Sequence, residues 1–195
     1  MRALGTLTVI AAGCPFISQN GQPAAVTVNV PKARIYGFEV DGSIDPARYL
    51  RIGGTLNYTN AKFTDNLVAL AGQTVPFSTY PDTPKFSGGA YADVTIPTTH
   101  AIDMLLHGDV YAQSKSFFSS AANLNPGAVL PSYTIVNFRV GVQDSVRGWS
   151  LTANLKNAFD KVYFVGGLPV APLTQINTIL PGAPRTFTLE ARMKF

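Results

Sequence analysis

The final ten residues of the sequence, 186–195, alternate between apolar and polar side chains without interruption. Phe187, Leu189, Ala191, Met193 and Phe195 share one parity, and the residues between them are threonine, glutamate, arginine and lysine. Successive side chains of a β-strand point to opposite faces. The segment is therefore predicted to be a strand with one apolar face and one charged face.

Seven further segments show the same period of two and are bounded by turn-forming residues. The predicted strands are 2–11, 33–45, 48–60, 85–96, 101–113, 132–143, 148–158 and 185–195. Each has about ten residues, which is the length that a tilted strand needs to cross a bilayer.

The charged residues of these segments are predicted to share one face of the sheet. One parity carries aliphatic, aromatic and glycine residues, as in Phe38, Val40, Leu106 and Val140, whereas Asp93, Arg139 and the other strand charges have the opposite parity. Only 13 % of the residues are charged, against roughly 25 % in soluble proteins. A lysine or arginine on the lipid side at mid-bilayer costs roughly 2–4 kcal/mol, so this segregation suits strands in a membrane.

The connections between the predicted strands alternate between short and long. Short ones are expected at 45–47, 97–100 and 144–147, and long ones at 12–32, 61–84, 114–131 and 159–184. Membrane barrels have this rhythm, with tight periplasmic turns and long outer loops. A soluble sandwich also keeps charges off its core face but has no such rhythm. The sequence thus predicts an all-β fold, an antiparallel transmembrane β-barrel.

Aromatic residues near the strand ends are expected to form girdles at the two membrane interfaces, or else to pack in the ordinary way beneath the loops. At the long-loop end they are Phe117, Phe118, Tyr133, Tyr163 and Phe164, and at the short-turn end they are Trp149 and Phe195.

Several other classes of function are disfavoured. The net charge of +4 is scattered rather than clustered, which argues against nucleic-acid binding. One cysteine, Cys14, and two histidines provide no metal or redox motif. His107 shares its predicted face with Asp103, Asp109 and Ser87, but no Gly-x-Ser-x-Gly motif accompanies them, so we expect no enzyme, no cofactor and no metal. Cys14 is an unpaired loop residue, the partner of a cysteine outside this sequence, or part of a lipoprotein-like signal.

The C-terminal third resembles the end of a TonB-dependent outer-membrane receptor. The resemblance rests on the run Asn157–Tyr163 (Asn-Ala-Phe-Asp-Lys-Val-Tyr), on Pro184–Phe187 leading into the terminal strand, and on the upstream strand Ala33–Asp41. It extends over nearly the whole chain from about Lys32. The family has a 22-stranded barrel plugged by an N-terminal domain, so about eight strands would correspond to its last eight. No plug or TonB-contacting segment is recognised, so we expect residues 1–195 to be the C-terminal barrel portion, a fragment.

The resemblance implies a place in the bacterial outer membrane and energy-dependent uptake of an iron–siderophore complex, cobalamin or glycan. Its partners would be outer-membrane lipid, the barrel-assembly machinery, a small ligand, and the TonB complex if the plug is present. The alternatives are a free-standing eight-stranded barrel with a structural or adhesive role, and a non-functional remnant with two open edges.

Two sets of site residues follow from this interpretation. Phe195, Phe187 and Tyr163 are expected to act in assembly and anchoring. The expected ligand contacts on the long loops are Tyr80, Asp82, Lys115, Asn123, Asn125, Gln175 and Asn177.

Overall fold

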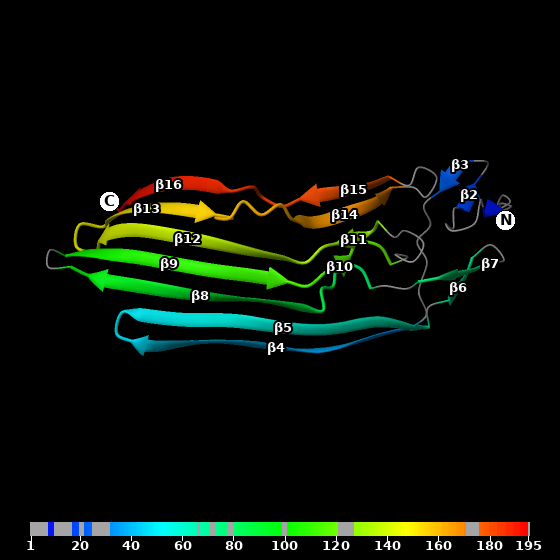
Figure 1. The fold of residues 1–195 in the computed structure, drawn as a ribbon, viewed down its shortest axis with the longest axis horizontal. Helices are drawn as coiled ribbons and strands as arrows, with labels where there is room; N and C mark the ends of the chain where they lie inside the picture. The colour runs from blue at the N-terminus through cyan, green and yellow to red at the C-terminus, as the bar shows by residue number, and fades with distance from the viewer. Residues whose placement is uncertain are drawn as a thin grey trace.

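The computed structural model is built of antiparallel strands, and its largest unit is a seven-stranded sheet (Figure 1). It describes residues 8–9, 17–19, 22–24, 32–65, 67–70, 73–77, 80–98, 101–120, 127–170 and 176–194. In that part of the chain, no helix is long and apolar enough to cross a membrane.

The strands of the large sheet follow one another as antiparallel neighbours in the order β16-β13-β12-β9-β8-β5-β4. Their bounds are β4 Lys32–Ala47, β5 Leu50–Asp65, β8 Phe86–Pro97, β9 Ile102–Gln113, β12 Tyr133–Asp144, β13 Trp149–Lys156 and β16 Thr186–Met193. Seven of the eight predicted strands are therefore confirmed. Among the described residues β4 and β16 are the two edges of the sheet and do not pair with each other.

The eighth predicted strand, 2–11, lies almost wholly outside the described residues. Its described part is β1 (Thr8–Val9), which pairs with β2 (Ile17–Gln19) and not with the large sheet. β2 in turn pairs with β3 (Gln22–Ala24).

The register aligns residues of one kind across all seven strands. One row on the apolar face runs Leu189, Ala153, Val140, Leu106, Val94, Leu50, Ala47. One row on the polar face runs Thr188, Asn154, Arg139, His107, Asp93, Arg51. A slip of one residue between any two strands would bring charges onto the apolar face, so the hydrophobic pattern fixes the register.

The segregation of charge is complete only in the middle of the sheet. Arg34 lies opposite Lys62 at the loop end, and Asp144 lies opposite Trp149 at the turn end, all with the parity of the apolar face. β4 and β5 have 16 residues each, more than the roughly ten that a tilted strand needs to cross a bilayer. The prediction that all strand charges share one face was thus wrong at the strand ends, where the alternation continues beyond the apolar band.

The first short turn is also displaced from its predicted position. Asp45–Ala47 still belong to β4, and the chain reverses at Arg48 and Tyr49. The ladder shifts register between Ile44 and Ala47, so a bulge accommodates Pro46, which has no N–H to donate. The carboxylate of Asp45 accepts two hydrogen bonds from the guanidinium of Arg51, at 2.8 and 3.2 Å, and closes the hairpin.

The predicted long loops contain short hairpins that gather at one end of the sheet, opposite the tight turns (Figure 1). They are β6–β7 (Leu67–Leu70 and Gln73–Pro76), β10–β11 (Ser116–Phe117 and Val129–Leu130) and β14–β15 (Phe164–Val170 and Ile176–Pro181). Of the described residues, the buried apolar ones lie here rather than on the sheet: Phe118, Ala128 and Leu130, with Phe164 packed against them. The expected girdle role of Phe118 and Phe164 was therefore wrong, because both belong to this loop core.

Candidate ligand-binding site

A chain of polar contacts runs along the polar face near the middle of the sheet. The imidazole of His107 lies between two carboxylates, with Nδ1 2.7 Å from Asp93 Oδ1 and Nε2 3.1 Å from Asp109 Oδ1. Asn137 donates to the other oxygen of Asp109 at 2.7 Å. The backbone N–H of Asn157 donates to Asn137 Oδ1 at 2.9 Å. These contacts link β8, β9 and β12 to the residue that follows β13, which gives this face a polar wall.

The geometry of this wall offers no Ser-His-Asp site. Ser87 lies opposite Gln113, whereas Asp93 lies opposite His107. Ser87 and Asp93 are six residues apart on β8, which is roughly 20 Å along a strand. Asp103, which the sequence grouped with His107, instead accepts a hydrogen bond from Gln143 at 3.2 Å. Within the described ranges, no group of three or more histidine, cysteine, aspartate or glutamate residues could hold a metal ion.

A cavity of about 400 Å³ lies at the loop end, where β5 and the chain entering β8 diverge. Its lining combines aromatic rings, hydroxyl groups and three lysines. The residues are Thr59, Asn60, Ala61, Lys62, Tyr80, Thr83, Lys85, Phe86, Ser114, Lys115 and Phe117. The cavity brings together Tyr80 and Lys115, two of the ligand contacts predicted from the sequence. Its mixed aromatic and basic lining suits a ligand with an unsaturated or acidic surface.

Of the other predicted ligand contacts, the two that the structure describes, Asp82 and Asn177, do not line this cavity. Asp82 adopts a positive φ of 50° and donates its backbone N–H to Phe117 O at 2.7 Å, so it connects two loop segments. Asn177 lies in β15 opposite Pro169. Asn123, Asn125 and Gln175 lie outside the described residues.

The run Asn157–Tyr163, which carried the family resemblance, forms a clamp between strands. Asn157 is buried at a positive φ of 48°. Its side chain donates to Lys161 O at 2.9 Å and Ala183 O at 3.1 Å, and accepts from Lys161 N at 2.8 Å. The carboxylate of Asp160 accepts from the backbone N–H of Arg185 at 3.2 Å. The run thus joins the end of β13 to the start of β16, which is a structural role that the sequence pattern alone did not reveal.

Tyr163 belongs to a cluster of three tyrosines at the loop end of the polar face. Its ring centroid lies 4.7 Å from that of Tyr133, and Tyr133 lies 6.1 Å from Tyr111. Tyr133 and Tyr111 have the parity of the polar face, so the expected lipid-side girdle role of Tyr133 was wrong. Tyr133 is an odd number of residues from Thr134 and Val136, which lie on the apolar face. The alternation of side chains along the strand therefore already placed Tyr133 on the polar face.

Of the other two predicted assembly residues, Phe187 is exposed on the apolar face of β16, opposite Leu155. Phe195 lies outside the described residues.

Comparison with known proteins identifies the class. The family model of the TonB-dependent receptor-like β-barrel matches residues 9–158. Because this match covers most of the chain, the protein belongs to the TonB-dependent receptor β-barrel family, a family of receptors rather than enzymes.

Three solved structures share the fold at low sequence identity. The ferric preacinetobactin receptor BauA of Acinetobacter baumannii has 20 % identity over 97 % of this chain and 24 % of its own, with a TM-score of 0.62. The ferric yersiniabactin uptake receptor FyuA of Yersinia pestis has 18 % identity over 84 % and 24 %, with a TM-score of 0.67. The ferric-catecholate import receptor Fiu of Escherichia coli K12, in its closed form, has 22 % identity over 84 % and 21 %, with a TM-score of 0.61.

The chain therefore spans about a quarter of the length of the solved receptors that it resembles. No curated protein sequence matches it.

Proposed function

We propose that residues 1–195 form the C-terminal barrel portion of an outer-membrane receptor that takes up a scarce nutrient, such as an iron–siderophore complex, cobalamin or a glycan. The apolar face of the seven strands would contact lipid and the polar face would form the inner wall. The observation that carries the proposal is this two-faced sheet with a basic and aromatic cavity at its loop end. An open cavity above a polar wall can capture a ligand at the entrance of a barrel.

An iron chelate is the ligand that we favour. The solved structures with this fold are receptors named for ferric chelates: preacinetobactin, yersiniabactin and catecholates. The three lysines of the cavity and the rings of Tyr80 and Phe117 offer charge and stacking to an acidic, unsaturated chelate.

Uptake by cells tests this function. A strain that lacks the gene is compared with its parent for accumulation of ⁵⁵Fe presented as hydroxamate, catecholate or mixed chelates, and of cobalamin and labelled oligosaccharides. We expect loss of uptake for one of these ligands and equal loss after disruption of TonB. Unchanged uptake of every ligand in the gene-deletion strain would contradict the proposal.

Variants of the complementing gene test the cavity. Tyr80→Ala and Lys115→Ala are each expected to weaken ligand binding roughly tenfold, the effect of losing one well-placed contact. Val146→Ala is the matched control, since Val146 is exposed in a tight turn at the other end of the sheet. Loss of binding in the control as well would show that the variants act through expression or folding.

Assembly belongs to the same proposal. We infer that Phe195, Phe187 and Tyr163 contribute to recognition by the barrel-assembly machinery and to anchoring. Deletion of Phe195 is expected to abolish membrane insertion while the protein is still synthesised. Normal yield of the deletion variant in outer membranes would refute this role.

The free-standing barrel is the weaker alternative, because β4 and β16 do not pair with each other among the described residues. An immunoblot of native outer membranes distinguishes the two. A band several-fold above 20.8 kDa would indicate part of a full receptor. A band near that mass whose mobility changes on boiling would indicate a small closed barrel.

A further inference from the structure

The polar contacts around His107 continue without a break to the base of the β14–β15 hairpin. Asp93 lies opposite His107 in the β8–β9 ladder, and Asn137 lies opposite Asp109 in the β9–β12 ladder. Asn137 donates to Asp109 at 2.7 Å and accepts the backbone N–H of Asn157 at 2.9 Å. These five residues are the polar relay, which connects the middle of the polar wall with the clamp at Asn157.

The clamp holds both ends of the β14–β15 hairpin. The Asn157 side chain bonds the backbone N–H and C=O of Lys161, just before β14, and the C=O of Ala183, just after β15. Between these points the backbone N–H of Gly182 donates to Tyr163 O at 2.8 Å. The hairpin carries Asn177, a predicted ligand contact, so the state of the clamp bears on ligand capture.

The geometry around His107 requires two protons on the imidazole ring. Nδ1 lies 2.7 Å from Asp93 Oδ1, and Nε2 lies 3.1 Å from Asp109 Oδ1. Ionised carboxylates only accept hydrogen bonds, whereas a neutral imidazole has one N–H and one acceptor nitrogen. Only the imidazolium can donate to both carboxylates, so loss of one proton sets two acceptors against each other. The His107 side chain is 25 % exposed, so it can exchange protons with solvent.

The other charged and titratable groups near His107 have partners of their own. Arg139 lies opposite His107 on β12, but its guanidinium donates to Asn154 on β13 at 2.8 Å. Arg51 on β5 is bonded within its own hairpin. The ring of Tyr91 on β8 stacks on the imidazole, with 6.2 Å between the ring centroids. Histidine is the side chain whose ordinary titration falls between about pH 5 and 8, so His107 is the group of the relay that a physiological change of pH can reach.

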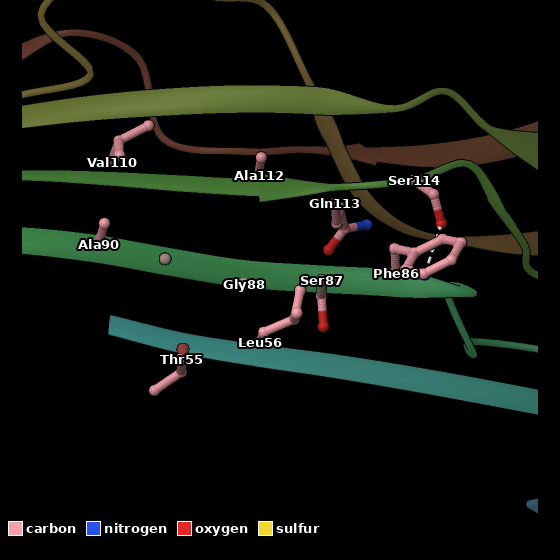
Figure 2. A pocket seen from close by; sticks show the side chains of 11 residues that line it. Thr55, Leu56, Phe86, Ser87, Gly88, Ala90, Val110, Ala112, Gln113 and Ser114 are labelled. Atoms are coloured by element: carbon pink, nitrogen blue, oxygen red, sulfur yellow. Dashed lines mark hydrogen bonds between the residues drawn. The ribbon is translucent and has the colours of Figure 1, made fainter. Parts of the chain in front are cut away.

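The opposite face of the same two strands is apolar. Its residues on β8 and β9 line a groove of about 350 Å³ and include Gly88, Ala90, Val110 and Ala112 (Figure 2). These four side chains have no hydrogen-bond donor. A carboxylate at Asp109 that loses its contact with His107 therefore has Asn137 as its remaining partner in the relay.

We propose that the polar relay is a proton-dependent latch on the β14–β15 hairpin. The imidazolium fixes the carboxylate of Asp109, which orients Asn137, and Asn137 holds the backbone of Asn157 in the clamp. When His107 releases a proton, its longer contact, at 3.1 Å to Asp109, is lost and the hairpin base opens more often. The latch is complete at low pH and weakens as the pH rises. Its effect on nutrient uptake rests on the proposed function, whereas the latch itself does not.

Hydrogen exchange of the hairpin amides tests the latch in the protein purified from its host membrane, without ligand. Rates at about pH 5.5 and about pH 8 are each divided by the intrinsic exchange rate at that pH. We expect protection in β14 and β15 to fall about fivefold from the lower to the higher pH, the low end of usual coupling between sites. H107Q keeps a polar side chain but takes up no proton, so its protection should not change with pH.

H100Q is the matched control, because it removes the other histidine of this chain, in the short connection between β8 and β9. It is expected to keep the full pH dependence of the hairpin. Each variant is first shown to retain the mobility difference between boiled and unboiled samples that marks a folded barrel.

Asn137→Ala interrupts the relay without removing the titrating group. NMR of ¹⁵N-labelled histidine is expected to show that His107 still titrates in this variant, while protection of the hairpin no longer changes with pH. The signals of His107 are assigned by their absence from H107Q. The double variant H107Q/N137A should be no less protected than N137A, because residues of one network do not contribute additively.

Three outcomes would overturn the inference: hairpin protection that is independent of pH in the unmodified protein, full pH dependence in H107Q, or full pH dependence in N137A. A His107 ring that carries a single proton at about pH 5.5 in the unmodified protein would also refute it, and this measurement needs no folded variant. Nutrient uptake separates the latch from the proposed function. Normal uptake with a pH-independent hairpin contradicts the latch alone, whereas a proton-dependent hairpin in a protein that takes up no nutrient contradicts transport alone.

Discussion

The large sheet and the loop-end hairpins follow different rules. In the middle of the sheet, apolar residues lie opposite apolar ones and polar residues opposite polar ones. Large apolar side chains such as Phe38, Val140 and Leu189 are nevertheless half exposed or more. In the hairpins, two-residue and seven-residue strands show no such alternation, but they enclose the small buried core of Phe118, Ala128 and Leu130.

The difference arises because the surroundings determine the side-chain pattern of the sheet but not that of the hairpins. A strand between lipid and an aqueous lumen must present two chemically different faces, so the environment imposes a period of two. A hairpin above the membrane meets water on several sides and gains no stability from alternation. It depends on particular contacts between loop segments, here a three-residue core and a set of side-chain hydrogen bonds to backbone groups.

The largest expected effect comes from placing a charge on the apolar face of a strand, and the same charge on its polar face serves as the comparison. Leu106 and Leu105 are neighbours in the middle of β9, but Leu106 lies opposite Val94 and Val140 on the apolar face, and Leu105 lies opposite Thr95 and Gly141 on the polar face. Leu106→Arg is expected to lower the free energy of unfolding by ~2–4 kcal/mol. Leu105→Arg should cost far less. Urea unfolding of the protein folded into phospholipid vesicles measures both, and equal losses would show that the apolar face does not contact lipid.

The hairpin core is expected to respond to truncation rather than to charge. Phe118→Ala removes a ring that packs against Gly167 of β14 and Phe164. The loss should be about 2 kcal/mol, below the ~3–5 kcal/mol of a large core because few buried neighbours surround it. Hydrogen exchange should rise in β11 and β14 and stay unchanged in β9 and β12. Faster exchange throughout the sheet would mean that the hairpins and the sheet unfold together.

Sequence reasoning succeeded where the environment imposes a pattern. Alternation of apolar and polar residues predicted the strand positions and the shared face of Val94, Leu106 and Val140. The lengths of the connections predicted that the tight turns and the long loops lie at opposite ends of the sheet. The hairpins within the long loops were not predicted from the sequence, because β10 and β11 are only two residues long and are held by contacts between distant segments. The cavity likewise depends on the point where two strands diverge. Tyr80 and Lys115 both line it, but their separation in the sequence gave no indication that they would lie near each other. Asn157 and Asp160 were recognisable only as members of a family-like run, not as a clamp.

That clamp provides the third test, because it joins the end of the sheet to the base of a hairpin. Asn157→Ala removes three side-chain hydrogen bonds. It also leaves an alanine, whose side chain can form no hydrogen bond, at a strained φ of 48°. A loss of about 1–2 kcal/mol is expected. Asn157→Gly relieves the backbone strain but not the lost hydrogen bonds, so it should be the milder variant. Proteolysis within 159–184 measures the opening, and identical rates in both variants would show that backbone conformation contributes nothing.

The smallest expected effect concerns the packing of one ring at the base of the β14–β15 hairpin. The backbone N–H of Gly182 donates to Tyr163 O at 2.8 Å, and a Cβ added to Gly182 would overlap the Tyr163 ring. Gly182→Ala should therefore push this ring against Tyr133 and cost about 1 kcal/mol, the lower range for overpacking. Gly166→Ala is the matched control, since its added Cβ would meet only a Leu180 methyl carbon at 3.4 Å. Because the tyrosines Tyr111, Tyr133 and Tyr163 line the polar face, Gly182→Ala should alter tyrosine fluorescence whereas Gly166→Ala should not. Equal spectra for the two variants would mean that the Tyr163 ring moves aside without pressing against Tyr133, and would contradict this prediction.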